Sequence, residues 1–212
     1  EICGYLFRPD RSLNPAGVYE IKSGKLGGDV APASNDELNK WLEDHPTHGG
    51  SAQDPITRLK KELRSLLKPK KDGNKVAVEP VETTRLEFKE SFHKNSFALY
   101  ARTILGFSNN SGGFIIFGIK DDKEVVGLQN NRFKEFDQKD FSQILKDISS
   151  PTARWTSFQI SLLGKTVGVF FSEEALQKPI ITLRNKDPIK GDSIYFRYEG
   201  ETSLIKSGDL LS

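Results

Sequence analysis

An apolar run from Phe114 to Ile119, interrupted only by Gly118, constrains the fold of this chain more than any other feature. Side chains at successive positions of a β-strand point to opposite faces, so a strand that is apolar throughout must be covered on both faces. Gly112 and Gly113 come directly before the run and indicate the end of a helix and a point of close packing. The sequence therefore predicts a fully buried strand that is entered from a helix.

The segments on either side of this run alternate between strand and helix patterns. Leu86 and Phe88 alternate with charged residues, which indicates a half-buried strand. Residues 97–107 have apolar side chains at helical spacing, and residues 124–128 follow an acidic turn as a partner strand. The predicted order of these elements is β-α-β-β.

The rest of the chain also contains both helix and strand patterns. Residues 137–148 have apolar side chains at positions i, i+3, i+4 and i+7, which predicts an amphipathic helix. Four later segments predict strands, at residues 155–162, 167–171, 179–183 and 193–198, and a last connection or helix starts at residue 202. The sequence as a whole predicts an α+β domain with a mixed β-sheet and a few packed helices.

We place this domain at residues 76–212 and a small accessory segment at residues 1–75. In the accessory segment, residues 18–26 predict a hairpin and residues 35–44 a helix. His45 and His48 lie in the polar link that comes next, and we interpret them as loop histidines because no further metal ligands have suitable spacing. The chain begins at Glu1, contains no methionine and ends on Leu-Leu-Ser, so we expect it to be a fragment with further domains.

A basic helix closes the accessory segment. Asp54 and Pro55 are good N-cap and first-turn residues, and leucines at helical spacing come after them. The stretch from Arg58 to Lys75 contains eight lysine and arginine residues and only two acidic residues, Glu62 and Asp72. Two interpretations stay open for this stretch: a solvated helix face with a frayed, lysine-rich end, or a phosphate-binding stripe.

Composition excludes several classes of protein. Cys3 is the single cysteine, so the chain forms no internal disulfide and no cysteine-based zinc site, and this suits a reducing, cytoplasmic compartment. No apolar run approaches the roughly 20 residues that span a bilayer, so we expect no membrane association. The net charge of +2 does not by itself indicate a nucleic-acid partner.

Three motifs in order carry a family resemblance. They are ETTRLEFKES from Glu82, then FSNNSGGFIIFGIKDD from Phe107, and late in the chain IYFR from Ile194 to Arg197. Over about residues 80–212 the chain resembles the Schlafen AlbA-like domain. The resemblance implies a nucleic-acid-binding fold and, in some members, a metal-dependent endoribonuclease that cuts structured RNA such as tRNA.

The same resemblance implies a site. When the catalytic residues of the family are assigned through the shared motifs, they correspond to Glu82, Glu87 and Asp122, with Asp121 as the alternative to Asp122. These residues would be catalytic and would hold Mg²⁺ or Mn²⁺. The relatives enclose RNA with two copies of the domain, so one copy here implies a homodimer. The residues expected to contact phosphates of RNA or DNA are Lys61, Arg64, Lys68, Lys70, Lys71, Lys89 and Arg197.

The chemistry of the carboxylates agrees with this expectation on one condition. Mg²⁺ and Mn²⁺ prefer carboxylate oxygens and keep positions open for water and phosphate. Glu82 and Glu87 are five positions apart, however, and lie on opposite faces of a regular strand, so they converge only across a bend or bulge. Lys89 shares the strand face of Glu87 and would steady its carboxylate or hold a phosphate.

Other functions stay open at this stage. Glu82, Glu87 and the two aspartates also suit solvent-exposed strand and turn positions. The alternatives to an enzyme are a non-catalytic DNA- or RNA-binding module of a larger regulatory or defence protein, and a protein-interaction domain. Gly164-Lys165-Thr166 resembles the end of a phosphate-binding loop, but the earlier glycine is absent, so we predict a hairpin turn there and no ATP site.

Overall fold

The computed structural model describes residues 54–72, 75–79 and 83–210. The chain divides into two compact units, Glu1–Leu59 and Lys60–Ser212, and the division falls inside helix α5 (Pro55–Leu66). The hairpin and helix expected before residue 54, and the two histidines after them, lie outside the described residues. Nearly all of the described residues belong to the second unit.

The second unit begins earlier than the predicted domain boundary at residue 76. Strand β1 (Lys68–Asp72) pairs antiparallel with β2 (Lys75–Glu79), so a division after residue 75 would cut through a hairpin. Of the two interpretations left open for this stretch, the frayed, lysine-rich helix end does not apply, because α5 stops at Leu66 and the lysines continue on a strand. Pro69 explains the stop, since proline has no backbone N–H and clashes with the preceding helical turn.

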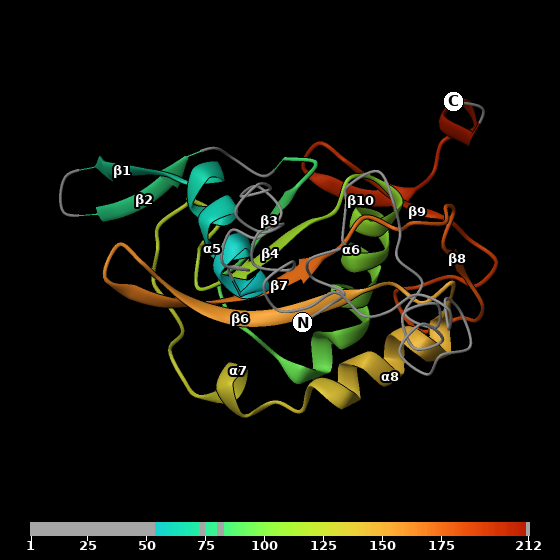
Figure 1. Ribbon diagram of the computed structural model, residues 1–212, viewed down its shortest axis with the longest axis horizontal. Coiled ribbons are helices and arrows are strands. Elements are labelled where there is room, and N and C mark those ends of the chain that lie inside the picture. Colours follow the sequence, from blue (N-terminus) through green and yellow to red (C-terminus); the bar gives the residue numbers. More distant parts are fainter. Residues whose placement is uncertain (1–53, 73–74, 80–82, 211–212) are drawn as a thin grey trace, which may run out of the picture. The chain divides into compact units, whose positions relative to one another are not determined.

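A four-stranded mixed sheet forms the centre of the unit, in the order β3-β4-β7-β6 (Figure 1). Strand β3 (Leu86–Lys89) is parallel to β4 (Gly113–Phe117), while β7 (Lys165–Ser172) is antiparallel to both β4 and β6 (Trp155–Leu162). Parallel neighbours need a crossover connection, and α6 (Phe97–Asn109) provides it. The predicted α+β fold is confirmed.

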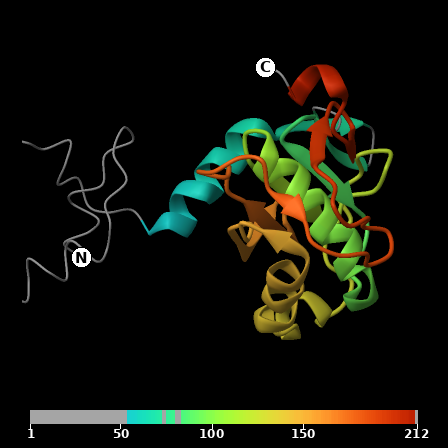
Figure 2. The same cartoon turned by 90° about the vertical axis from the view of Figure 1, so that its right-hand side faces the viewer.

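Two helices and one face of this sheet share the main core. Ile115, Phe117 and Phe170 from the sheet are fully buried in one cluster with side chains of α6 and of α8 (Gln138–Ile148). The packing of α8 beside α6 is visible in Figure 2. Asp137 caps α8 by accepting a hydrogen bond from the Lys139 amide at 2.8 Å, as expected for a residue at the start of a helix.

The double glycine performs both predicted roles. Gly112 has φ +72°, a left-handed conformation that ends a helix, and its amide donates to the Phe107 carbonyl at 2.9 Å. A Cβ on Gly113 would lie 2.6 Å from the Phe107 ring and 2.8 Å from the Arg85 carbonyl oxygen. The chain can therefore pass from α6 into the buried strand β4 only with small residues at this point.

Short elements complete the unit. Residues 124–128 form isolated bridges, Ile119 with Val125 and Ala77 with Glu124, in place of the full strand that their sequence predicts. Residues 201–204 form strand β10 (Glu201–Leu204) and not the start of a helix. The remaining elements are η1 (Lys94–Ser96), α7 (Arg132–Glu135), β5 (Ser149–Ser150), β8 (Ile181–Thr182), β9 (Tyr195–Tyr198) and η2 (Ser207–Leu210).

These short strands pair with each other: β5 with β8, and β9 with β10, both antiparallel. The β9–β10 hairpin packs against α6. None of the helices in the described part of the chain is both long enough and apolar enough to cross a membrane.

Candidate functional site

Glu87 lies on β3 with its carboxylate held between two cations. One oxygen, Oε1, is 2.5 Å from Lys89 Nζ, and the other, Oε2, is 2.7 Å from Arg197 Nη2. The Glu87 side chain is only 10% exposed and that of Lys89 is 32% exposed. Lys89 thus lies where it steadies the Glu87 carboxylate, one of the two roles expected of it, and the negative charge of Glu87 is compensated inside the protein.

Arg197 connects β9 to the start of β3. Besides Glu87, its guanidinium donates to the carbonyl oxygens of Leu86 at 2.8 Å and Thr83 at 3.3 Å, and to the Thr202 hydroxyl at 3.3 Å. The guanidinium carbon lies 5.2 Å from the centre of the Phe107 ring. The whole residue is 1% exposed. Such a set of partners satisfies nearly all the donors of a buried arginine.

The burial of Arg197 corrects one expectation. The late IYFR motif suggested a cation that contacts phosphate, but the side chain points into the domain, where it neutralises Glu87. Alternation along β9 gives the reason: Tyr195 and Arg197 face inwards, and Phe196 and Tyr198 face outwards and are half-buried. A phosphate would reach this guanidinium only by displacing a buried carboxylate.

Asp121 and Asp122 lie in the exposed turn after Ile119. Asp122 Oδ1 accepts a hydrogen bond from the Glu124 amide at 3.1 Å, the usual way in which an aspartate stabilises a turn. Next to it, the Glu124 carboxylate accepts a hydrogen bond from Lys120 Nζ at 2.9 Å, and this bond raises the pKa of Lys120. Asp122 therefore has a local structural role in the turn.

The described residues do not by themselves form a metal site. Across residues 54–72, 75–79 and 83–210, no group of three or more His, Cys, Asp and Glu side chains is placed to hold a metal ion. Glu82, the third residue expected at this site, lies outside the described residues. The two cations on Glu87 also oppose a divalent ion at the same oxygens, because like charges repel at close range.

Exposed cations lie on two elements that follow each other in the chain, α5 and β1. On α5, Lys61 and Arg64 are exposed, and Leu63 is fully buried on the other face of the helix. On β1, Lys68 and Lys70 are exposed and share a strand face because they are two positions apart. Lys70 pairs with Glu79 at 3.0 Å. We call Lys61, Arg64, Lys68 and Lys70 the α5–β1 basic surface; Lys71 also belongs to β1, but its side chain is not among those described.

Asn109 has a role that sequence patterns do not reveal. Its amide nitrogen donates to the carbonyls of Ile180 at 3.0 Å and Tyr195 at 2.9 Å, and its amide oxygen accepts from the Ile180 amide at 2.7 Å. The residue is 5% exposed. Its place at the end of α6 predicts a helix cap, but the side chain instead joins the helix end to segments more than 70 positions later.

The Gly164-Lys165-Thr166 tripeptide is a hairpin turn, as predicted. Leu162 pairs with Lys165 across the β6–β7 hairpin, and the two residues between them have φ values of +53° and +79°. Positive φ at both central positions is typical of a tight hairpin turn. The tripeptide leads into strand β7 and not into a helix, so it lacks the geometry of a phosphate-binding loop.

The domain has an α+β fold of the kind expected from the motifs. It contains a parallel β3-α6-β4 unit that two antiparallel strands extend, and the buried pair of Glu87 and Arg197 lies beside this unit. A family model described as Schlafen, AlbA_2 matches residues 82–206. The chain belongs to this family, which confirms the resemblance that its motifs carry. Membership of this family indicates a nucleic-acid-related role for the domain.

Several known proteins are similar to this chain in sequence or in structure. An uncharacterized ATP-binding protein from Ureaplasma parvum serovar 3 is 32% identical over 171 residues, which cover 73% of this chain and 48% of the relative. The chain thus spans about half the length of that relative. A crystal structure of a Corynebacterium diphtheriae protein matches 72% of this chain and 27% of its own, with 19% identity and a TM-score of 0.47.

A third similar protein is the N-terminal domain of a RecG-related protein from Nitrosomonas europaea, determined in solution. It matches 57% of this chain and 82% of its own length, with 23% identity and a TM-score of 0.37.

Proposed function

We propose that this domain binds nucleic acid through the α5–β1 basic surface. The observation that carries the proposal is the exposure of four cations on two consecutive elements, while the apolar side of α5 is buried. Lys and Arg side chains bind phosphates with little dependence on sequence, and they need only to be clustered and accessible. Family membership supports the same role. RNA, including tRNA, and DNA are the polymers to compare, and a cytoplasmic location is part of the proposal.

The charge reversal Lys61→Glu, Arg64→Glu, Lys68→Glu should weaken binding of both RNA and DNA by about tenfold or more at low salt. The slope of log affinity against log salt should fall by about 2 to 3, because each phosphate contact contributes about 0.7 to 0.9 to that slope. Gel retardation and fluorescence anisotropy across a salt series measure both quantities.

The matched control is Lys134→Glu, Lys139→Glu, Lys165→Glu, which makes the same change in net charge at exposed positions outside the basic surface. Equal weakening in the two triple variants would contradict a localised interface. Sedimentation of the complexes gives the stoichiometry, and one protein per nucleic acid at all concentrations would contradict the homodimer that the family resemblance implies.

A metal-dependent endoribonuclease is the finer candidate. It is favoured by the match of Glu82 and Glu87 to the family motif, although Lys89 and Arg197 already compensate the charge of the Glu87 carboxylate. Glu82, Glu87 and Asp122, or Asp121 in its place, would hold Mg²⁺ or Mn²⁺, and the ion would stabilise charge on the phosphate being cut. Since the described residues do not form a metal site alone, this candidate depends on Glu82.

Glu82→Gln and Asp122→Asn should each reduce cutting of total tRNA by about a hundredfold or more. A bound metal ion contributes several kcal/mol of transition-state stabilisation, and each ~1.4 kcal/mol is a factor of ten in rate. The assay compares Mn²⁺, Mg²⁺ and EDTA on denaturing gels, with binding measured in parallel. We avoid Glu87→Ala as the main test, because it would leave Arg197 unpaired and destabilise the domain.

Glu135→Gln, at an exposed position outside the basic surface, is the control for loss of a carboxylate outside the expected site. Cutting that survives EDTA, or that is the same in Glu82→Gln as in the unchanged protein, would remove the nuclease candidate and leave the binding module.

The name of the Ureaplasma relative, an ATP-binding protein, suggests nucleotide binding as a further possibility for this chain. The Gly164-Lys165-Thr166 turn offers no support for it in this chain. Any nucleotide site must therefore be sought among other residues.

A further inference from the structure

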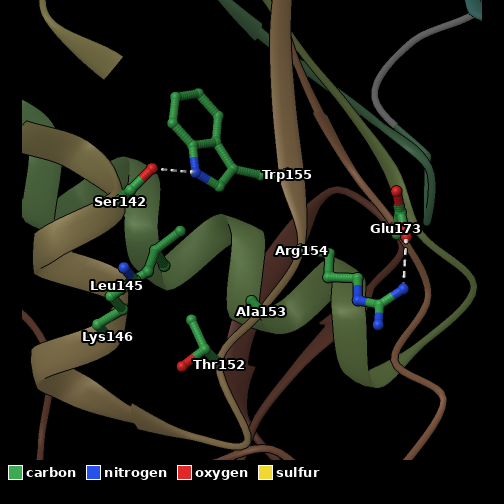
Figure 3. Close-up of a pocket in the computed structure, with 8 residues that line it drawn as sticks. All are labelled: Ser142, Leu145, Lys146, Thr152, Ala153, Arg154, Trp155 and Glu173. Carbon is green, nitrogen blue, oxygen red and sulfur yellow. Dashed lines mark hydrogen bonds and ion pairs between the residues drawn. The ribbon is translucent and has the colours of Figure 1, made fainter. Parts of the chain in front are cut away.

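An open space lies between α8 and the start of β6. A cavity of about 350 Å³ is lined there by residues of α8, by Thr152 to Trp155 and by Glu173. Figure 3 shows the Trp155 indole at one end and Thr152 at the other, with Leu145 and Lys146 on one side and Arg154 and Glu173 opposite. None of these residues belongs to the α5–β1 basic surface or to the expected carboxylate site.

The inner part of the cavity is apolar and aromatic. Leu145 and Ala153 are 0% and 4% exposed and form its floor. The indole of Trp155 is half-buried and packs against the rings of Phe141 and Phe170, with centroids 4.6 and 4.9 Å away. These contacts hold the indole in one position before any ligand arrives, which lowers the entropy cost of binding.

The indole has no hydrogen bond left to offer a ligand. Its single donor, Nε1, already donates to the Ser142 hydroxyl at 3.1 Å, and an indole has no acceptor. What Trp155 presents to the cavity is therefore aromatic surface alone. A flat ring that stacks on or against it would gain from the contact, whereas a small polar ion would not.

The rim of the cavity is charged and accessible. Lys146 and Thr152 are exposed, and the Arg154 side chain is 70% exposed. Arg154 is paired with Glu173, but at 4.0 Å and with both side chains largely in solvent, so this pair is weak and its arginine can exchange partners at little cost. Two cations against one carboxylate favour an anionic group at the rim.

We propose that this cavity binds one nucleotide, with the base against Trp155 and the phosphate between Lys146 and Arg154. Its volume is near the lower end of the range of about 300 to 1,000 Å³ for ligand pockets, which suits a mononucleotide better than a longer segment. The nucleotide is either free or part of a strand bound by the domain. In the second case the inference rests on the proposed nucleic-acid binding.

Trp155 fluorescence tests the site directly. The chain has two tryptophans, so Trp41→Phe in the full chain leaves Trp155 as the only indole probe. AMP should quench its emission with saturation, and adenosine should do so more weakly because it lacks the phosphate. Ribose 5-phosphate, which lacks the base, should not quench. Absence of saturable quenching by AMP would overturn the proposal.

Charge variants test the rim without disturbing the core. Lys146→Glu and Arg154→Glu should each weaken AMP binding by about tenfold, as expected for the loss of a charged hydrogen bond. The control is Lys139→Glu, an exposed lysine on the same helix that does not line the cavity. If all three variants weakened AMP binding equally, AMP would be attracted by the general charge of the protein. This result would overturn the proposed site.

Competition distinguishes the two sources of the nucleotide. Displacement of AMP by a short single-stranded oligonucleotide would assign the site to a bound strand, and its failure to displace AMP would assign it to free nucleotides. The Lys61→Glu, Arg64→Glu, Lys68→Glu variant should bind AMP normally. AMP could quench the Trp155 emission of the unchanged protein while the same protein leaves the gel mobility of nucleic acid unchanged. In that case the basic-surface proposal fails and the nucleotide site stands.

Discussion

Replacing Arg197 by leucine is expected to lower the free energy of unfolding by about 3 to 5 kcal/mol. The guanidinium is 1% exposed, and its removal leaves the Glu87 carboxylate inside the domain with Lys89 as its remaining cation. It also removes the hydrogen bonds that the guanidinium donates to the carbonyls of Thr83 and Leu86. Urea denaturation followed by circular dichroism measures the change.

The control for Arg197→Leu is Arg184→Leu, which removes an exposed arginine and should cost less than about 0.5 kcal/mol. Combining Arg197→Leu with Glu87→Leu tests the cause. If the cost comes from an unpaired buried charge, the double variant should be less destabilised than the sum of the single variants. A loss below about 1 kcal/mol in Arg197→Leu would contradict this account of the pair.

Replacing Asn109 by alanine is expected to cost about 3 kcal/mol or more. Three buried backbone groups lose their partner, the amide and carbonyl of Ile180 and the carbonyl of Tyr195, and each unsatisfied group costs about 1 to 3 kcal/mol. Urea denaturation gives the total loss. Hydrogen exchange gives a local measure, because the Ile180 amide should lose protection more than the amides of β4.

Asn110→Ala is the matched control for Asn109→Ala. The Asn110 side chain donates a hydrogen bond from its amide nitrogen to the Arg197 carbonyl at 2.7 Å, and the residue is only half-buried. Its loss should cost about 1 kcal/mol. Equal losses in the two variants would show that Asn109 does not hold the β8 and β9 segments through its three hydrogen bonds.

Most of the regular elements can be predicted from local patterns. The helix that apolar spacing predicts at residues 137–148 appears as α8, and the strand predicted at residues 155–162 appears as β6 with the same bounds. Such patterns work because the period of the apolar side chains depends on the element itself and not on its partner. The tight turn at Leu163-Gly164 is also predictable, since its geometry depends on adjacent residues.

Two segments differ from the sequence-based expectations, one although local signals are present and one through a partner elsewhere in the chain. The lysines after Leu67 form a strand and not a helix end, although Pro69 and the Asp72-Gly73 pair are local signals for a stop and a hairpin turn. Residues 124–128 do not form the full strand that their pattern predicts, and besides the bridge from Ile119 to Val125 the Val125 amide donates to the Val76 carbonyl of β2 at 2.8 Å. Nothing in the sequence of that segment indicates β2 as its neighbour.

The sequence by itself determined the α+β class, the buried strand after the double glycine and the family to which the chain belongs. Each depends on the order and type of neighbouring residues. Only the tertiary structure decided that Arg197 neutralises Glu87, that Asn109 joins three segments, and that residues of α8 line a common cavity with Glu173. These outcomes depend on contacts between residues far apart in the chain, and a charged side chain has the same appearance in a sequence whether it faces solvent or a buried partner.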